Sequence, residues 1–263
     1  MRKVSILGAG WLMQKFIYRY INAYKFLYTN RAVNNTTEQE SNAFLVHLDG
    51  ERIYGSMDKL FETETLIISI PPPSSRNPYK PSALLPLLEK SKVKKILLLS
   101  STSVYLKNNG IVDEKSPLNP HSPMYDLEQA ILSINNVALT ILRFGGLIGA
   151  ERHPGNFFRR TLQLSNGNAL VNLIHYEDCL SIIDQIIQND IWGACFNCCA
   201  DYHPMKKDFY TAAAASLGLE LKVDAKLAPN SYVLVDNSKL KKVLNYEFSH
   251  NDLTALIEPE NWC

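Results

Sequence analysis

The chain has 263 residues, enough for one large α/β domain or for a cofactor domain with a smaller cap. Hydrophobic residues make up 46% and charged residues 20%, which excludes a disordered chain, and the net charge of +1 gives no general attraction to nucleic acid or an anionic membrane. Because the first apolar run is too short for a signal peptide, no segment has the roughly 18 apolar residues of a membrane span, and the cysteines suggest no disulfide framework, we expect a cytoplasmic protein.

Short apolar runs alternate with helix-length segments over the first two-thirds of the chain. The expected strands cover residues 3–7, 26–28, 43–46, 65–70, 95–100 and 138–142, and the expected helices cover residues 11–21, 81–90 and 122–134. Continuous apolar strands separated by helices are typical of a parallel sheet covered on both faces. Right-handed crossovers then make it a doubly wound sheet, so the sequence predicts an α/β fold of the Rossmann type.

The pattern changes after residue 144, where glycines and prolines interrupt the chain. Helices are expected over residues 175–187 and 204–217, the second ended by Gly218, with a strand over residues 195–198. We therefore expect one domain over residues 1–144. The segment 145–263 is expected to complete the sheet and to form a small substrate-side lobe.

A glycine turn lies between the first strand and the first helix, in the run Gly8-Ala9-Gly10-Trp11-Leu12-Met13. Gly8 permits a tight turn, Gly10 lets a pyrophosphate approach the backbone, and the helix that begins at Trp11 and Leu12 offers N–H groups and a partial positive charge. Met13 replaces the third glycine of the usual pattern. The turn predicts a dinucleotide site, and a plain strand-to-helix turn is the alternative.

The end of the second strand reads Thr29-Asn30-Arg31 and holds no carboxylate for a ribose 2′-hydroxyl. We expect Asn30 and Arg31 to contact the ribose, with the Arg31 guanidinium on a 2′-phosphate. This favours NADP(H), and NAD(H) is the alternative cofactor. For Arg31 itself, the alternative is a solvated loop residue without a cofactor contact.

Four further motifs carry a family resemblance. They are Ser100-Ser101-Thr102-Ser103-Val104-Tyr105, Ser122-Pro123-Met124-Tyr125, Leu142-Arg143-Phe144-Gly145-Gly146-Leu147-Ile148-Gly149, and Asn172-Leu173-Ile174-His175-Tyr176-Glu177-Asp178. With the glycine turn, they resemble the extended short-chain dehydrogenase/reductase superfamily in its NAD-dependent epimerase/dehydratase branch. The chain looks most similar to the nucleoside-diphosphate-sugar-epimerase-like proteins of that branch.

The resemblance implies an NAD(P)-binding oxidoreductase or epimerase that acts on a hydroxyl or carbonyl of a small polar substrate, such as a nucleotide sugar. In the family, Tyr125 would transfer the proton and Ser101 would orient the substrate oxygen, while Pro71 and Ser100 would line the cofactor. Gln129 stands where the family has a lysine and carries no charge to stabilise a phenolate. A non-catalytic NADP(H)-binding sensor or interaction protein is therefore the alternative function, and an oligomer is compatible with either.

Two other groups of residues suggest chemistry less strongly. Cys195 and Cys198, with His203, have a spacing that invites a zinc interpretation, but strand residues alternate in direction and no second cluster follows. We expect no metal site and take the cysteines as small buried hydrophobes. His175 and Asp178 are interpreted as packing and helix-terminal residues, with an acid/base pair as the alternative.

Overall fold

The computed structural model describes residues 1–30, 43–45, 47–49, 52–54, 59–75 and 78–257. These residues form two compact units that alternate along the chain. The first unit comprises Met1–Ser100, Asn119–Leu142 and Asp190–Cys195, and the second comprises Ser101–Leu118, Arg143–Asn189 and Phe196–Cys263.

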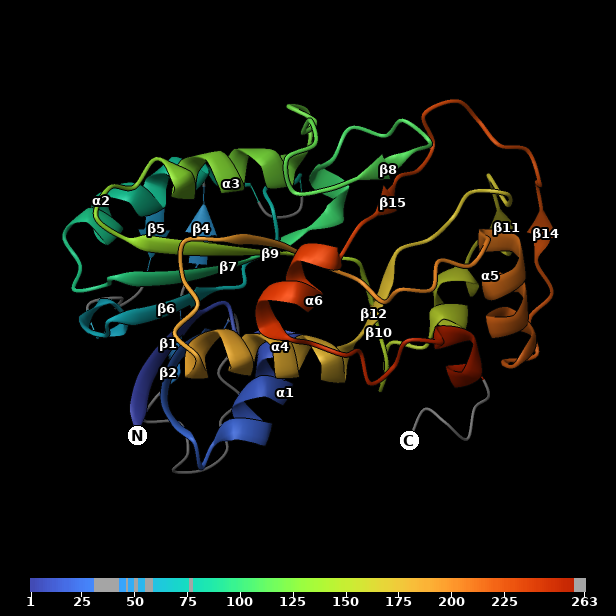
Figure 1. The fold of residues 1–263 in the computed structure, drawn as a ribbon. Coiled ribbons are helices and arrows are strands. Elements are labelled where there is room, and N and C mark those ends of the chain that lie inside the picture. The colour runs from blue at the N-terminus through green and yellow to red at the C-terminus, as the bar shows by residue number, and fades with distance from the viewer. Residues whose placement is uncertain (31–42, 46, 50–51, 55–58, 76–77, 258–263) are drawn as a thin grey trace. The chain divides into compact units, whose positions relative to one another are not determined.

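A seven-stranded sheet organises the first unit, in the order β13-β9-β7-β6-β1-β2-β3 (Figure 1). Its strands are β1 (Arg2–Leu7), β2 (Tyr24–Asn30), β3 (Ala43–Leu45), β6 (Thr65–Ile68), β7 (Lys95–Ser101), β9 (Ala138–Phe144) and β13 (Cys195–Cys198). The pairs β1–β2, β1–β6, β2–β3 and β6–β7 are parallel. The last strands, β9 and β13, continue into the second unit.

Helices cover both faces of this sheet. In Figure 1, α1 (Trp11–Tyr20) lies on one face, and α2 (Leu85–Glu89) and α3 (Pro123–Leu132) lie on the other. Strand residues such as Ile67 and Leu97 are fully buried, because helices exclude water from both faces. The predicted doubly wound α/β fold is confirmed. A short antiparallel hairpin, β4 (His47–Asp49) with β5 (Arg52–Tyr54), follows β3.

Two predicted helices are shorter than expected. The segment 81–90 begins as a 3₁₀ turn, η3 (Pro81–Leu84), and becomes α-helical only in α2. Pro81 at the first position is tolerated, but Pro86 lacks the N–H that a continuous helix would bond to the carbonyl of Ser82, so an α-helix begins only just before it. The helix predicted over 204–217 is α5 (Lys206–Ala215), and Gly218 follows it with a positive φ of 70°.

The described part of the second unit contains α-helices and several short strand pairs. The helices are α4 (Tyr176–Gln188), α5 and α6 (Ser238–Leu244). The parallel pairs are β10 (Gly146–Ile148) with β12 (Leu173–His175), β11 (Gln163–Leu164) with β14 (Lys222–Val223), and β8 (Ile111–Val112) with β15 (Leu234–Val235). Further 3₁₀ turns are η2 (Leu60–Glu62) in the first unit, and η4 (Thr102–Val104), η5 (Pro154–Phe158) and η6 (Leu253–Leu256) in the second.

The cysteines within the described ranges are free thiols: Cys179, Cys195, Cys198 and Cys199. Burial raises the pKa of the Cys199 thiol well above its ordinary value, so it stays protonated. In the same ranges, no helix combines the length and the apolar character that a membrane crossing requires.

Candidate functional site

The glycine turn after β1 is held in place by the end of β2. The amide of Gly8 donates to Thr29 Oγ1 at 2.8 Å, and the amide of Ala9 donates to the Thr29 carbonyl at 2.8 Å. Gly8 has a φ of +94°, and a Cβ on it would lie 2.8 Å from the Ser69 carbonyl oxygen. Only glycine fits this position, because both the backbone conformation and the close approach of the next strand exclude a side chain.

Gly10 caps the N-terminus of α1 and leaves that end open. Its backbone is extended, no side chain caps the helix, and a Cβ on Gly10 would have no atom within 4 Å. The first-turn amides of Trp11 and Leu12 therefore point from an uncapped helix end, where the helix dipole favours an anion. Met13, in place of the third glycine, is fully buried and packs as a core residue.

This turn lies where the strand order reverses. β1 pairs with β6 on one side and with β2 on the other, so the connections leave it in opposite directions. In open α/β sheets, ligands bind in the crevice at the carboxyl ends of the strands at this switch point. The geometry of the first unit thus places an exposed, phosphate-compatible backbone at the position that the topology favours for a ligand.

Pro71 follows β6 at the same edge of the sheet. Its ring is exposed, and its carbonyl accepts a hydrogen bond of 2.9 Å from the Tyr79 hydroxyl. Asn30 is the last residue of β2 and pairs with Leu45 of β3. Arg31 lies outside the described residues, so its role as a 2′-phosphate ligand stays a prediction.

Ser100 makes a contact that the sequence did not suggest. It is buried near the end of β7, and its hydroxyl donates to Glu128 Oε1 of α3 at 2.5 Å. Glu128 is fully buried. The hydroxyl proton of Ser100 is thus used inside the first unit, and Ser100 could contact a cofactor only as an acceptor, through its oxygen lone pairs. Nothing in the sequence marks Glu128 as different from an ordinary exposed helix glutamate.

The predicted catalytic residues fall in different compact units. Tyr125 is half-buried in the first turn of α3, and Gln129 is exposed one turn later in the same helix. Ser101 begins the second unit, where its Oγ accepts a hydrogen bond of 3.1 Å from the amide of Ser103. That bond leaves the Ser101 hydroxyl proton for another acceptor. The pairing of Ser101 with Tyr125 stays a prediction.

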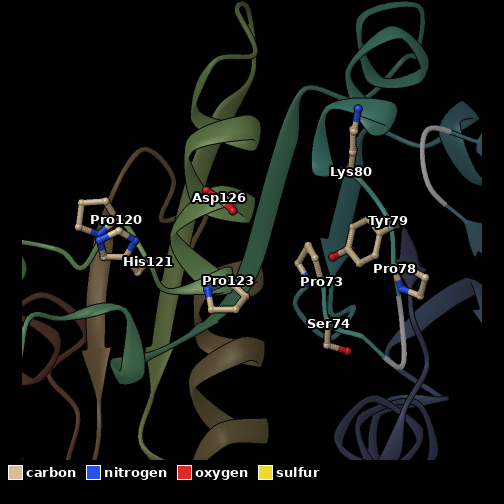
Figure 2. Close-up of a pocket in the computed structure, with 9 residues that line it drawn as sticks. All are labelled: Pro73, Ser74, Pro78, Tyr79, Lys80, Pro120, His121, Pro123 and Asp126. Carbon is tan, nitrogen blue, oxygen red and sulfur yellow. The ribbon is translucent and has the colours of Figure 1, made fainter.

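A hollow of about 650 Å³ opens in the first unit between the segment after β6 and the start of α3 (Figure 2). Its lining residues are Pro73, Ser74, Pro78, Tyr79, Lys80, Pro120, His121, Pro123 and Asp126. Rigid prolines shape the walls, and Lys80, His121 and Asp126 add polar side chains of both charges. The size is that of small-molecule sites, which are mostly apolar with a few polar groups. No sequence motif indicated this hollow, because two separate loops form it.

The cysteine-containing segment has the predicted strand geometry in β13. Cys198 is fully buried. His203 Nδ1 lies 3.3 Å from the Val171 carbonyl oxygen, and not beside a cysteine sulfur. Within the described ranges, the cysteines and His203 form no group of converging metal-ligand atoms.

Comparison with known proteins gives a relative by sequence and several solved structures of similar fold. No protein-family model matches the chain. The protein YeeZ of Escherichia coli (strain K12) is 29% identical over 268 residues, which cover 96% of this chain and 97% of YeeZ.

Solved structures share the fold of this chain over nearly its whole length. A short-chain dehydrogenase/reductase superfamily protein from Agrobacterium tumefaciens with bound NAD is 16% identical, with a TM-score of 0.76 over 99% of this chain and 96% of the other. A variant of UDP-glucuronic acid 4-epimerase from Bacillus cereus, in complex with UDP-4-deoxy-4-fluoro-glucuronic acid and NAD, is 17% identical, with a TM-score of 0.77 over 98% of each chain. The fold that the resemblance implies is therefore confirmed.

Proposed function

We propose that this protein binds a nicotinamide dinucleotide and acts, as a member of the short-chain dehydrogenase/reductase superfamily, on a hydroxyl or carbonyl of a small polar substrate. The uncapped, exposed helix end at Gly10, located where the strand order reverses, is the observation that carries the proposal. Proteins of the same fold bind NAD, one of them together with a UDP-sugar analogue.

The residues of the turn fit a dinucleotide. The amides of Trp11 and Leu12 would receive the pyrophosphate, Gly10 would let it approach the backbone, and Pro71 would form a wall beside the adenosine. Arg31, directly after β2, makes NADP(H) the preferred form, with a guanidinium fork for the 2′-phosphate. When bound, the nicotinamide supplies the hydride or accepts it.

The chain itself would handle the proton. The Tyr125 phenol exchanges a proton with the substrate oxygen, and the free hydroxyl proton of Ser101 holds that oxygen by a hydrogen bond. Gln129, exposed in the next turn of α3, can donate a hydrogen bond but carries no charge, so it cannot stabilise a phenolate as a lysine would. Turnover should therefore be slow and rise toward alkaline pH.

The hollow between the segment after β6 and α3 is the proposed substrate site. Lys80 and His121 are suited to the negative groups of a nucleotide sugar, and Asp126 to its hydroxyl groups. The rival proposal, a cofactor-binding sensor without turnover, rests on Gln129 alone.

The deciding experiment begins with calorimetric titration of the full chain with NADPH and with NADH. Nucleotide sugars and simple carbonyls are then screened for turnover by the absorbance of the reduced nicotinamide. Saturable binding with turnover supports the enzyme, and binding without turnover supports the sensor. Binding of neither dinucleotide would refute both.

A further inference from the structure

Three potential metal ligands converge in the second unit, at the N-terminus of α4. His175 ends β12 and caps α4, Glu177 lies in the first turn of α4, and His250 lies in the loop after α6. The ligand atoms of these three side chains all lie within 4.8 Å of one another. His250 Nε2 is 3.4 Å from Glu177 Oε2, and His175 Nδ1 is 3.9 Å from the same oxygen.

The ring of His175 is held by packing, and its Nδ1 is buried without a hydrogen-bond partner. Its side chain is only 9% exposed, and Nδ1 is a buried atom without any hydrogen bond. The ring fits closely against Gly149, because a Cβ on Gly149 would lie 2.3 Å from His175 Nε2. A buried polar atom without a partner costs free energy, so an unpaired Nδ1 directed toward a carboxylate and a second imidazole indicates a missing ligand.

Asp178 orients the second imidazole. Its carboxylate accepts hydrogen bonds from the Tyr246 hydroxyl at 2.7 Å and from the amides of Ser249 and His250 at 2.8 and 3.1 Å. The same carboxylate lies 3.4 Å from His250 Nδ1, which is buried and forms no hydrogen bond at this separation. The negative charge of this carboxylate favours the tautomer with its proton on Nδ1, which leaves the Nε2 lone pair free.

We propose that His175 Nδ1, His250 Nε2 and Glu177 Oε2 bind a divalent transition-metal ion, with Zn²⁺ as the preferred ion. Zinc takes nitrogen and oxygen ligands at about 2.0–2.2 Å, which separates neighbouring ligands of a tetrahedron by roughly 3.3–3.5 Å. The 3.4 Å separation already fits. The 3.9 Å separation requires a movement of the Glu177 side chain, which is 41% exposed. The two imidazole nitrogens lie within 4.8 Å of each other, so a metal also requires a movement of the His250 ring, which is 22% exposed.

The electrostatics suit a dication. The Glu177 and Asp178 carboxylates balance two positive charges and offset the positive end of the α4 dipole. Two imidazoles select against Mg²⁺ and Ca²⁺, which prefer oxygen ligands. Three protein ligands leave the fourth position to water or a small ligand.

The test is zinc titration of the full chain, freed of metal by a chelator, followed by calorimetry. We expect one Zn²⁺ per chain and no binding of Mg²⁺. Glu177→Gln and His250→Ala should each weaken zinc binding by about 10-fold or more. Glu247→Gln is the matched control, because this residue is exposed and lies outside the metal-binding group, and its zinc affinity should equal that of the wild type.

The absence of a saturable zinc site, or a weakening of less than about 10-fold in both variants, contradicts the proposal. X-ray absorption of the zinc-loaded wild type decides the matter if a variant fails to fold, since it requires no substitution. Imidazole scattering in a shell of nitrogen and oxygen is expected. A sulfur ligand would move the site to the cysteines and overturn the assignment.

Discussion

The hydroxyl of Ser100 lies 2.5 Å from Glu128 Oε1, and both side chains are buried, with exposures of 6% and 0%. This hydrogen bond ties strand β7 to helix α3 inside the first unit. A buried carboxylate is costly unless it is hydrogen-bonded, so the stability of the unit should depend on this pair.

Replacing Ser100 by alanine should lower the free energy of unfolding by about 1.5–3 kcal/mol, the value of a hydrogen bond to a charged group. Urea denaturation measures the loss. Ser103→Ala is the control, because that side chain is exposed and only its backbone amide is bonded, and it should change stability by less than about 0.5 kcal/mol. Equal small losses in the two variants would show that the pair contributes little.

Acid should destabilise the metal-free protein through His175. Burial in the first place, and His250 in the second, lower the pKa of His175 from 6.5 to about 4, while Asp178 opposes the change. The unfolded chain binds a proton below about pH 6.5, and the folded chain only near pH 4, so stability is complete above pH 6.5 and is lost as the pH falls toward 4. The difference corresponds to about 3 kcal/mol.

An NMR titration of the histidine rings checks this shift directly in the wild type. The titration should be followed for His175 and His250 together, because Glu177 and Asp178 face both rings. His203, half-buried and bonded to a carbonyl, serves as an internal comparison. A His175 ring that titrates at its ordinary value would contradict the buried, neutral state.

The Arg31 prediction concerns cofactor choice. Arg31→Ala should weaken NADPH binding by about 1.5–3 kcal/mol, the value of a charge-assisted hydrogen bond, and leave NADH binding unchanged. Calorimetry with both cofactors makes the comparison. Equal losses for both cofactors, or none for either, would show that Arg31 does not contact the 2′-phosphate.

Catalysis, where it occurs, should depend on Tyr125. General acid–base catalysis contributes about 10²–10⁴-fold, so Tyr125→Phe should remove most of the activity. Gln129→Lys should raise the rate at neutral pH and shift the pH–rate profile to lower values, because an ammonium stabilises the phenolate. Full activity in Tyr125→Phe would rule out this tyrosine as the proton-transfer residue.

The sequence predicted the elements of the first unit well, for a physical reason. Strands such as β6 and β7 are buried on both faces, so they read as unbroken apolar runs between helix-length segments. The short strands β10, β11 and β12 were missed, since two or three residues carry no periodicity. The prediction of one continuous helix over 81–90 was wrong, because Pro86 interrupts the helical hydrogen bonds.

The candidate sites were predictable only where one short segment forms them. Gly8 and Gly10 were identified because the turn is local. Glu128 was not, since its partner Ser100 comes from another element, and a helix glutamate is ordinarily exposed. His250 likewise meets His175 only through the fold. The sequence predicted no metal site at the cysteines and His203. The ligand atoms that converge in the structure belong to His175, Glu177 and His250.

The most direct test of the proposed function is dinucleotide binding by Gly10→Val, with Gly10→Ala as the intermediate size. The extended backbone of Gly10 accepts a side chain, and no atom lies within 4 Å of its Cβ, so both variants should stay folded and lose only the roughly 1 kcal/mol that a poorer N-cap residue costs. A valine at this position nevertheless blocks the approach of a pyrophosphate to the helix end. We predict that calorimetry will show weaker binding in Gly10→Ala and none in Gly10→Val. Wild-type affinity in a folded Gly10→Val protein would contradict the account.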